Sequence, residues 1–367
     1  MYLNRLFPKS YPSLDWIQVE ISSYCNASCI YCPHFAYRKN WQNRYLPMET
    51  FRKLAPAFAR TQLVYLQGWG EPFTHPRFFD MLRFAQKAGC AVGTTTNGTM
   101  LPRETIERLV NEGLDIIGFS LVGVDERNDS IRQGTRIKKV LECIEEIQRV
   151  RDKYGAAKPK IHIAYILLRS GLADLDRLPA FLANTGAEQT VVSSLSLAVS
   201  PAMAAEMVLA TGKTEYEELK NRLIEVRDAA AGLGAEVHFH IITPEREGFH
   251  CRENCARAIV VGSEGSLSPC VMKQIPALGQ NFFYLGGQKQ LQQNLVFGHI
   301  NADSLNRIWH RKEYRRFIRA YLRGEVPGSC RNCLKQFSDS LEPSNGSNAM
   351  PKQSQNWETL LRDSAGN

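Results

Sequence analysis

Residues 16–32 form a strand-like run that ends in three cysteines, Trp16-Ile17-Gln18-Val19-Glu20-Ile21-Ser22-Ser23-Tyr24-Cys25-Asn26-Ala27-Ser28-Cys29-Ile30-Tyr31-Cys32. The apolar and β-branched side chains at 16–21 are typical of a buried strand in a parallel sheet. In barrels built from β-α units, the loops that follow the strands form the active face. The three thiols therefore indicate a metal centre just after the first strand.

Short apolar runs alternate with helical patterns through the first 200 residues. Further strands are predicted at 63–67, 91–95, 116–121, 160–168 and 189–193. Between them, apolar residues recur at helical spacing, as at Phe78, Leu82 and Ala85 before Gly89. Six β-α units fit an open, partial (β/α)6 TIM-like barrel better than a full barrel, because too few residues remain for eight units. The predicted fold class is α/β.

We expect four segments along the chain. Residues 1–200 form the partial barrel, and 201–248 form a connecting helix and strand. Residues 249–340 form a small C-terminal α+β cysteine-rich domain, with helices between 303 and 323. Residues 341–367 are polar and rich in helix breakers at their start, so they are expected to be a mobile tail.

The composition is that of a globular protein. Of 367 residues, 44% are hydrophobic and 22% are charged, which argues against wholesale disorder. The start of the chain lacks the long apolar core of a signal peptide. The most apolar tract, 195–210, contains Pro201 and Glu206 and falls short of a membrane-spanning helix. We therefore expect a cytoplasmic protein without a membrane partner.

Ten cysteines fall into two groups and two isolated residues. Cys90 and Cys143 lie alone in apolar segments and are expected to be buried as small hydrophobic residues. Disulfides suit short secreted chains, which this chain is not, so grouped thiols point to metal. The second group lies near the end of the chain and contains Cys251, Cys255, Cys270, Cys330 and Cys333.

Three thiolates within eight residues leave a tetranuclear iron–sulfur cluster one ligand short. An iron with an open position can chelate a small molecule. A structural zinc site would instead be closed by a fourth protein ligand, and His34 is a candidate for that position. The spacing alone leaves both kinds of site open.

The first group resembles the signature of the radical S-adenosylmethionine (radical SAM) enzymes, C-x3-C-x-aromatic-C, with Cys25, Cys29, Tyr31 and Cys32 at the matching positions. The resemblance implies a [4Fe-4S] cluster on the three cysteines, with Tyr31 beside the cofactor. It also implies that S-adenosylmethionine binds the unique iron. Reductive cleavage would then yield a 5′-deoxyadenosyl radical that abstracts hydrogen from a substrate.

Three further stretches at strand ends resemble motifs of the same family. Gly68-Trp69-Gly70-Glu71-Pro72 resembles Gly-Gly-Glu-Pro, with Trp69 in place of the first glycine, which implies cofactor contacts at Gly70 and Glu71. Thr96-Asn97-Gly98-Thr99 resembles the Thr-Asn-Gly turn, although Asn97 would also suit a turn without a ligand. Ser120 matches a cofactor-contacting serine, but the Asp-Gly that often follows in relatives is replaced by Val122-Gly123.

Arg132 is a further candidate, for the methionyl carboxylate of S-adenosylmethionine. The alternative is an ordinary surface charge.

The second cysteine group resembles the SPASM or twitch extension of many radical enzymes. Cys255-x9-Gly265-x4-Cys270 and Cys330-x2-Cys333 supply four thiols, which can close one auxiliary iron–sulfur cluster or one zinc site. Gly265 ends a predicted hairpin turn that would bring Cys255 and Cys270 together. Full SPASM domains have further cysteines after the last pair, so we expect a truncated version with a single auxiliary cluster. Cys251 is surplus to its four ligands, and three roles stay open for it: it replaces Cys255 as a ligand, reaches into the active site, or is a spare thiol.

The charges indicate an acidic partner. The formal net charge is +8, and residues 303–335 contain nine Lys or Arg against three Asp or Glu. Such a patch suits a peptide or a flavodoxin- or ferredoxin-type reductant, or it is simply a solvated helix face. Aromatic and basic residues do not interleave as in nucleic-acid grooves, so nucleic acid is not expected.

The sequence leads to one functional hypothesis and one rival. The first is a radical SAM oxidoreductase or maturase acting on a peptide, protein or cofactor. The rival is a non-catalytic zinc or iron–sulfur binding protein or sensor, in which the metal would be saturated by protein ligands.

Overall fold

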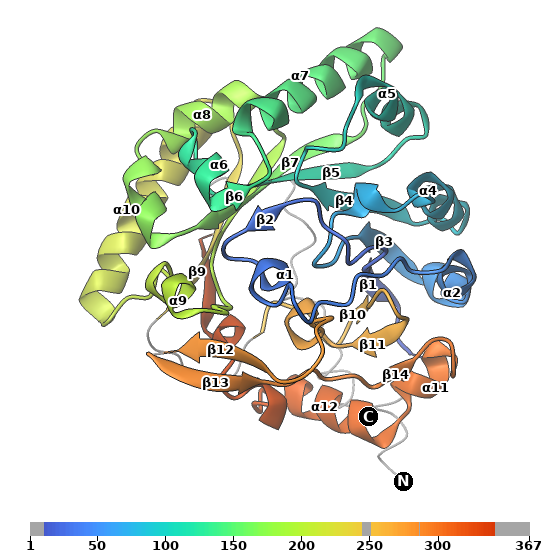
Figure 1. Cartoon of the computed structure of the whole chain (residues 1–367). Coiled ribbons are helices and arrows are strands. Elements are labelled where there is room, and N and C mark those ends of the chain that lie inside the picture. Colours follow the sequence, from blue (N-terminus) through green and yellow to red (C-terminus); the bar gives the residue numbers. More distant parts are fainter. Residues whose placement is uncertain (1–10, 244–250, 286, 342–367) are drawn as a thin grey trace, which may run out of the picture.

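A large, mostly parallel β-sheet organises the chain (Figure 1). The computed structural model describes residues 11–243, 251–285 and 287–341, and for 338–341 the backbone alone. Seven strands follow one another in parallel order: β1 (Leu14–Val19), β3 (Thr61–Leu66), β4 (Ala91–Thr96), β5 (Ile116–Leu121), β7 (Lys160–Leu167), β8 (Gln189–Ser194) and β9 (Val237–Ile242). The first six are the predicted strands, with small shifts at their ends.

β9 extends this sheet. The sequence pattern predicted the strand in this region within a connecting segment between the two domains. It pairs in parallel with β8, where Thr190 aligns with Val237. Across the described residues the strand order runs β14-β11-β10-β1-β3-β4-β5-β7-β8-β9-β15. The two end strands do not pair with each other in this described part, so the sheet is open. The α/β class is therefore confirmed, whereas the predicted partial barrel is not.

Amphipathic helices cover the outer side of the curved sheet (Figure 1). α4 (Phe78–Lys87) buries Phe78, Leu82 and Ala85 as predicted, and it is followed by Gly89 at φ 90°. Longer helices on this side include α5 (Arg103–Asn111), α7 (Ile137–Tyr154), α8 (Leu178–Thr185) and α10 (Lys213–Gly232). Among the described residues, none of the helices has the length and apolarity needed to cross a membrane.

The cysteine-rich part of the chain joins the same sheet at both edges. β10 (Ala258–Val261) pairs in parallel with β1, and β11 (Ser266–Ser268) and β14 (Gly298–His299) continue that edge in antiparallel pairing. β15 (Ser338–Leu341) pairs with β9 at the opposite edge. β12 (Asn281–Leu285) and β13 (Gln288–Gln292) form a separate hairpin. The division into segments at 200 and 248 stays a prediction.

Local signals near the end of the chain are also confirmed. The turn between β10 and β11 closes with a hydrogen bond from the Gly265 N–H to the Gly262 carbonyl (2.8 Å), and Gly265 has a φ of 88°. The predicted helices near 303–323 are α11 (Leu305–Trp309) and α12 (Lys312–Leu322). The expected tail lies, apart from Leu341, outside the described residues.

The two isolated cysteines are buried in the main core, as expected. The thiol of Cys90 donates to the Phe58 carbonyl (3.0 Å), and that of Cys143 lies 3.5 Å from the Gly98 carbonyl. Both thiols are thereby satisfied by nearby backbone.

Candidate functional site

The first cysteine group lies in the loop after β1, within the concave side of the sheet (Figure 1). Cys29 belongs to the two-residue strand β2 (Ser28–Cys29), and the short helix α1 (Pro33–Ala36) begins directly after Cys32. The Cys32 N–H donates to the Cys29 carbonyl (3.0 Å). All three cysteines belong to one apolar cluster with Tyr31. The loop therefore gathers the three thiols, as predicted.

The three thiols interact electrostatically. Burial, together with nearby Glu71 and Cys29, raises the pKa of Cys25 to about 11. Burial and the neighbouring Cys29 raise the pKa of Cys32 to about 12. Three buried thiolates side by side are unfavourable without positive charge, and a bound metal supplies it.

His34 does not cap this group with its ring. The ring packs edge-on against Trp41 (centroids 5.1 Å apart) and hydrogen-bonds with Asn43, while the backbone N–H of His34 donates to the Cys32 sulfur. In the part of the chain that the structure describes, no three Cys, His, Asp or Glu side chains lie close enough to hold a single metal ion. A tetranuclear cluster places each thiolate on a different iron, so it needs three separate sulfurs.

A buried cation accompanies the thiols. Arg132 belongs to β6 (Arg132–Gln133), which pairs with β2 so that Arg132 aligns with Cys29. Its side chain is 4% exposed and donates to the Tyr31 hydroxyl, while its Nε is buried without a hydrogen-bond partner in the described structure. Burial lowers the pKa of Arg132, but the neighbouring Tyr31 and Cys29 raise it by more than burial lowers it. The pKa is therefore raised overall, and the guanidinium stays charged. This environment fits a negatively charged metal–thiolate group, which would compensate the buried charge.

The Gly-Trp-Gly-Glu-Pro loop after β3 packs directly against the segment that leads to Cys25. The Glu71 N–H donates to the Tyr24 carbonyl (2.7 Å). A Cβ at Gly70 would lie 2.4 Å from the Ser22 carbonyl oxygen, so only glycine fits there. Gly70 thus allows two backbone segments to lie against each other, whereas its contact with the cofactor stays a prediction.

Glu71 links this loop to the turn after β4. Its carboxylate accepts hydrogen bonds from the Thr96 hydroxyl (2.8 Å), the Asn97 N–H (2.8 Å) and the Phe73 N–H (3.3 Å). Burial is the main cause that raises its pKa to about 7. Through these hydrogen bonds, Glu71 connects the loop after β3 to the turn after β4.

Asn97 forms the turn that the sequence indicated, and its side chain also extends towards the first cysteine group. Its Oδ1 accepts from the Thr99 N–H (2.9 Å), which forms the expected turn around Gly98. Its Nδ2 donates to Asn26 (2.9 Å) and lies 4.0 Å from the Cys25 sulfur. Asn97 is therefore beside the first cysteine group. Ser120 is half-buried near the end of β5 and makes no hydrogen bond to the other predicted site residues in the described structure.

Trp69, which departs from the family motif, connects the two cysteine regions. Its indole N–H donates to the Gln274 carbonyl (2.8 Å), four residues after Cys270. Its backbone N–H donates to Glu20 (2.8 Å), whose other oxygen accepts from Ser263. The replacement of glycine by tryptophan thus ties the loop after β3 to the cysteine-rich region. The sequence did not indicate this contact.

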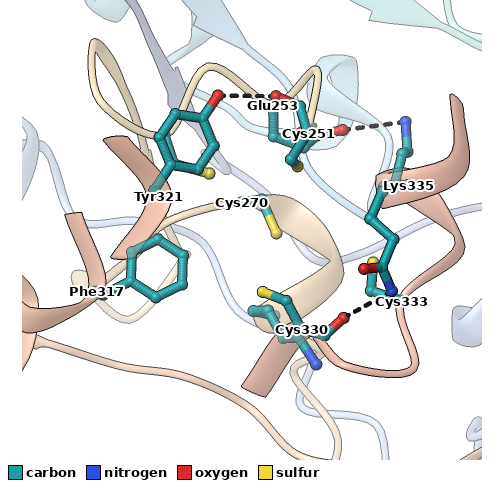
Figure 2. Close-up of a pocket in the computed structure, with 11 residues that line it drawn as sticks. Cys251, Glu253, Cys270, Phe317, Tyr321, Cys330, Cys333 and Lys335 are labelled. Carbon is teal, nitrogen blue, oxygen red and sulfur yellow. Dashed lines mark hydrogen bonds and ion pairs between the residues drawn. The ribbon is translucent and has the colours of Figure 1, made fainter. Parts of the chain in front are cut away.

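The second cysteine group surrounds one pocket (Figure 2). Cys270 comes just before the turn η4 (Val271–Lys273), and Cys330 and Cys333 lie at and after the turn η5 (Gly328–Cys330). The Cys333 N–H donates to the Cys330 carbonyl (3.0 Å). The pocket is lined by all four predicted cysteines and by Cys251, together with Glu253, Lys273, Phe317, Tyr321, Lys335 and Gln336. The structure thus brings five thiols together where four were predicted.

Cys251 differs from the other four thiols in its electrostatics. The Cys255 thiol donates to the Cys251 sulfur, which lowers the pKa of Cys251 and raises that of Cys255. Burial raises the pKa of Cys333 to about 11. The Tyr321 hydroxyl donates to the Cys251 carbonyl (2.8 Å) and fixes this segment against α12. The sequence placed Cys251 in the second group because it lies four residues before Cys255, but it did not show that both thiols face one pocket.

Positive charge also accompanies the second group. Lys335 forms an ion pair with Glu253 (3.0 Å), and Lys273 lies on the same pocket wall. Two lysines beside five thiols fit a metal–thiolate cluster better than neutral thiols alone. The basic segment 303–335 is thus only partly a surface feature, because Lys335 faces this pocket.

Two protein-family models match the chain. The radical SAM superfamily model matches residues 19–155, and the SPASM model, an iron–sulfur cluster-binding domain, matches residues 251–334. The tungsten-containing aldehyde ferredoxin oxidoreductase cofactor-modifying protein of Pyrococcus furiosus is 27% identical over 326 residues, which cover 87% of each chain. The mycofactocin maturase MftC of Mycolicibacterium smegmatis is 24% identical over 176 residues, 47% of this chain and 42% of MftC.

Solved structures share the fold. Streptococcus suis SuiB bound to S-adenosylmethionine superposes with a TM-score of 0.60 at 18% identity, covering 89% of this chain and 72% of SuiB. The structure of anSMEcpe with bound AdoMet superposes with a TM-score of 0.59 at 16% identity, covering 95% and 92%. With both family models matched at the two cysteine groups, the chain belongs to the radical SAM superfamily and carries a C-terminal SPASM iron–sulfur cluster-binding domain.

Proposed function

We propose that this enzyme cleaves S-adenosylmethionine reductively at a [4Fe-4S] cluster held by Cys25, Cys29 and Cys32, and that the resulting 5′-deoxyadenosyl radical abstracts hydrogen from a substrate. The radical SAM domain implies the cluster and S-adenosylmethionine as cofactors, and the SPASM domain implies an auxiliary iron–sulfur centre. The observation that carries the proposal is the group of three thiols beside the buried, incompletely paired Arg132.

The chain's own residues would prepare this site in defined ways. Arg132 holds a positive charge next to Cys29 and keeps one donor available for a negatively charged group. Gly70 lets the backbone of its loop lie against the segment before Cys25. Glu71 fixes that loop to the turn that carries Asn97. Tyr31, Asn97 and Ser120 are proposed to contact the cofactor.

We assign the auxiliary centre to Cys255, Cys270, Cys330 and Cys333. All four line the pocket in Figure 2. Four thiolates are enough to close one tetranuclear cluster, which would supply a one-electron acceptor near the substrate. Cys251 is a fifth thiol at the same pocket, and its role is separate from this assignment.

The proposed substrate is a peptide, protein or cofactor undergoing maturation. The Pyrococcus furiosus relative is named as a cofactor-modifying protein and MftC as a maturase. The SuiB and anSMEcpe structures include complexes with peptides. The exposed basic side chains of Arg307, Lys312 and Arg316 would suit an acidic reductant of the flavodoxin or ferredoxin type.

Anaerobic reconstitution with iron and sulfide tests the proposal. We expect about eight irons per chain, and about four when Cys25, Cys29 and Cys32 are replaced by Ala. The reconstituted wild type should form 5′-deoxyadenosine from S-adenosylmethionine in the presence of dithionite, and the triple variant should not. Stoichiometric zinc in the first group, or no 5′-deoxyadenosine, would favour a non-catalytic metal-binding protein instead.

A further inference from the structure

Lys273 is a buried cation beside the second cysteine group. It ends the turn η4 that follows Cys270, and it is only 7% exposed. It lines the pocket of that group together with Cys270, Cys330 and Cys333. Within the described residues, its side chain forms no ion pair and no hydrogen bond. A buried ammonium group without a partner is costly, so a negatively charged group in this pocket would stabilise it.

The other two charged residues of the pocket compensate each other. Lys335 forms an ion pair with Glu253, with 3.0 Å between the Nζ and Oε1 atoms. Glu253 is the single acid among the described residues that line the pocket. Because its carboxylate is already paired, the charge of Lys273 remains uncompensated. The thiols would supply the opposing charge once they bind metal as thiolates.

The backbone fixes Lys273 at this position. Its N–H donates to the Cys270 carbonyl (3.1 Å). Its carbonyl accepts from the Leu295 N–H (2.8 Å) and from the Ser268 hydroxyl (3.2 Å). These hydrogen bonds connect the turn after Cys270 to β11 and to the segment that follows β13. The position of the lysine therefore does not depend on contacts of its ammonium group.

The charge of Lys273 acts on two thiols from a distant part of the chain. Burial raises the pKa of Cys333 to about 11, and Lys273 is among the groups that counteract this rise. Burial also raises the pKa of Cys330, and Lys273 again counteracts it. Phe317 and Tyr321 of α12 line the same pocket with aromatic rings (Figure 2). In such surroundings water screens charges weakly, so their interactions are strong.

A fixed cation changes how readily an iron–sulfur cluster is reduced. The cluster gains one negative charge on reduction, and its reduction potential depends on net charge, on hydrogen bonds to its sulfurs and on solvent exposure. A buried positive charge beside it favours the reduced form. We propose that Lys273 raises the reduction potential of the auxiliary cluster and so makes this cluster a better electron acceptor. The inference rests on the proposed function only in assigning a cluster to Cys255, Cys270, Cys330 and Cys333.

A redox titration of the auxiliary cluster alone tests the proposal. The full chain with Cys25, Cys29 and Cys32 replaced by Ala is reconstituted with iron and sulfide, so that iron binds only at the second group. The electron paramagnetic resonance signal of the reduced cluster is followed as the applied potential is lowered. In this parent protein, Lys273→Gln should make the cluster about tenfold harder to reduce, which lowers the potential of a one-electron couple by about 59 mV.

Two matched variants separate the charge from the shape of the side chain. Lys273→Arg keeps the positive charge, so its potential should stay close to that of the parent protein. Lys87→Gln removes the same charge from an exposed position on α4 and should leave the potential unchanged. Equal potentials in Lys273→Gln and Lys87→Gln would overturn the proposal. An equal fall in Lys273→Arg and Lys273→Gln would overturn it too, because the charge would then not be the cause.

The metal-free protein provides a second measurement that does not require a bound cluster. Lys273→Met keeps an unbranched side chain and removes the buried charge, so the melting temperature should stay equal or rise. A lower melting temperature would show that the lysine serves the fold, and would overturn the proposal. If Lys273→Gln does not retain iron, Lys273→Met replaces it in the redox titration. Loss of iron from both, but not from Lys273→Arg, would reject tuning in favour of a role in cluster assembly.

Formation of 5′-deoxyadenosine by the reconstituted wild type is measured separately. Its absence, together with a lowered potential in Lys273→Gln, would reject the proposed radical chemistry alone. Its formation, together with an unchanged potential in Lys273→Gln, would reject the role of Lys273 alone. A parent protein that binds no iron at the second group would reject the auxiliary assignment, and this inference with it.

Discussion

Cys29 aligns with Arg132 in the antiparallel pair formed by β2 and β6, so a buried guanidinium lies next to the first cysteine group. A buried cation without a full set of partners is costly, and removing the opposing charge makes it more so. Burial raises the pKa values of Cys25 and Cys32 in the metal-free chain, so these two thiols do not supply that charge. A bound anionic cluster would supply the opposing negative charge, so Arg132 and the cluster should stabilise each other.

Replacing Arg132 should therefore impair the loaded site. In Arg132→Gln, we expect 5′-deoxyadenosine formation to fall by about tenfold to a hundredfold, since a charge-assisted interaction contributes about 1.5–3 kcal/mol. Timed formation of 5′-deoxyadenosine by reconstituted protein is the measurement. Arg316→Gln, which changes the same residue type on an exposed helix face, is the control. Equal rates for the two variants would show that Arg132 has no part in the site.

Trp69 should stabilise the junction between the loop after β3 and the cysteine-rich region. Trp69→Phe removes the indole N–H and leaves the Gln274 carbonyl without that donor. We expect the free energy of unfolding to fall by about 1 kcal/mol, which denaturant titration can resolve. Trp16→Phe is a matched control, because the Trp16 indole makes no hydrogen bond in the described structure and should change stability less. An effect of Trp16→Phe as large as that of Trp69→Phe would contradict this account.

Local sequence patterns were sufficient for most strands and helices. Buried parallel strands such as β5 and β7 are continuous apolar runs, and a helix such as α4 shows its buried face through residues three or four apart. The sequence located the motif residues near the first cysteine group because they follow the ends of neighbouring parallel strands directly. Gly70, Glu71 and Asn97 are accordingly close to Cys25 in the structure.

Long-range pairings were not available from the same patterns. That β10 lies beside β1 and β15 beside β9 depends on contacts between segments far apart in the chain, which local periodicity does not encode. For the same reason, the sequence left the role of Cys251 open, and the structure places this residue in the lining of the second group's pocket. The contact from Trp69 to Gln274 was missed because Trp69 was considered only as a departure from a motif.

Glu71 should make the stability of the metal-free protein depend on pH. Its pKa is raised by burial from 4.5 to about 7 in the folded chain. The folded state therefore holds a proton that the unfolded state has lost, and the free energy of unfolding should fall as the pH rises from 4.5 through about 7. The free energy of unfolding should be about 3 kcal/mol lower well above pH 7 than well below pH 4.5, as far as Glu71 contributes to it. Denaturant titrations at several pH values measure it.

The variant Glu71→Gln should flatten this dependence. It carries no titratable group, so the change in unfolding free energy across this pH range should shrink towards zero for this site, even though a lost hydrogen bond to Asn97 lowers stability at every pH. Glu145→Gln, at an exposed position on α7, should keep the wild-type slope. A wild-type slope in Glu71→Gln would mean that Glu71 is ionised throughout.

The two cysteine groups should bind their clusters independently, since they lie in separate parts of the fold and line different spaces. In Cys270→Ala, iron should fall from about eight to about four per chain, and 5′-deoxyadenosine should still form at the first group. Cys143→Ala removes a buried core thiol that lies near the Gly98 and Leu101 carbonyls and outside both cysteine groups, so its iron content should equal that of the wild type. If Cys270→Ala instead lost all iron, the groups would depend on each other, and if it kept all iron, Cys270 would not be a ligand. The retained cleavage would then isolate what the auxiliary centre contributes, because any loss of substrate conversion in this variant arises after the radical has formed.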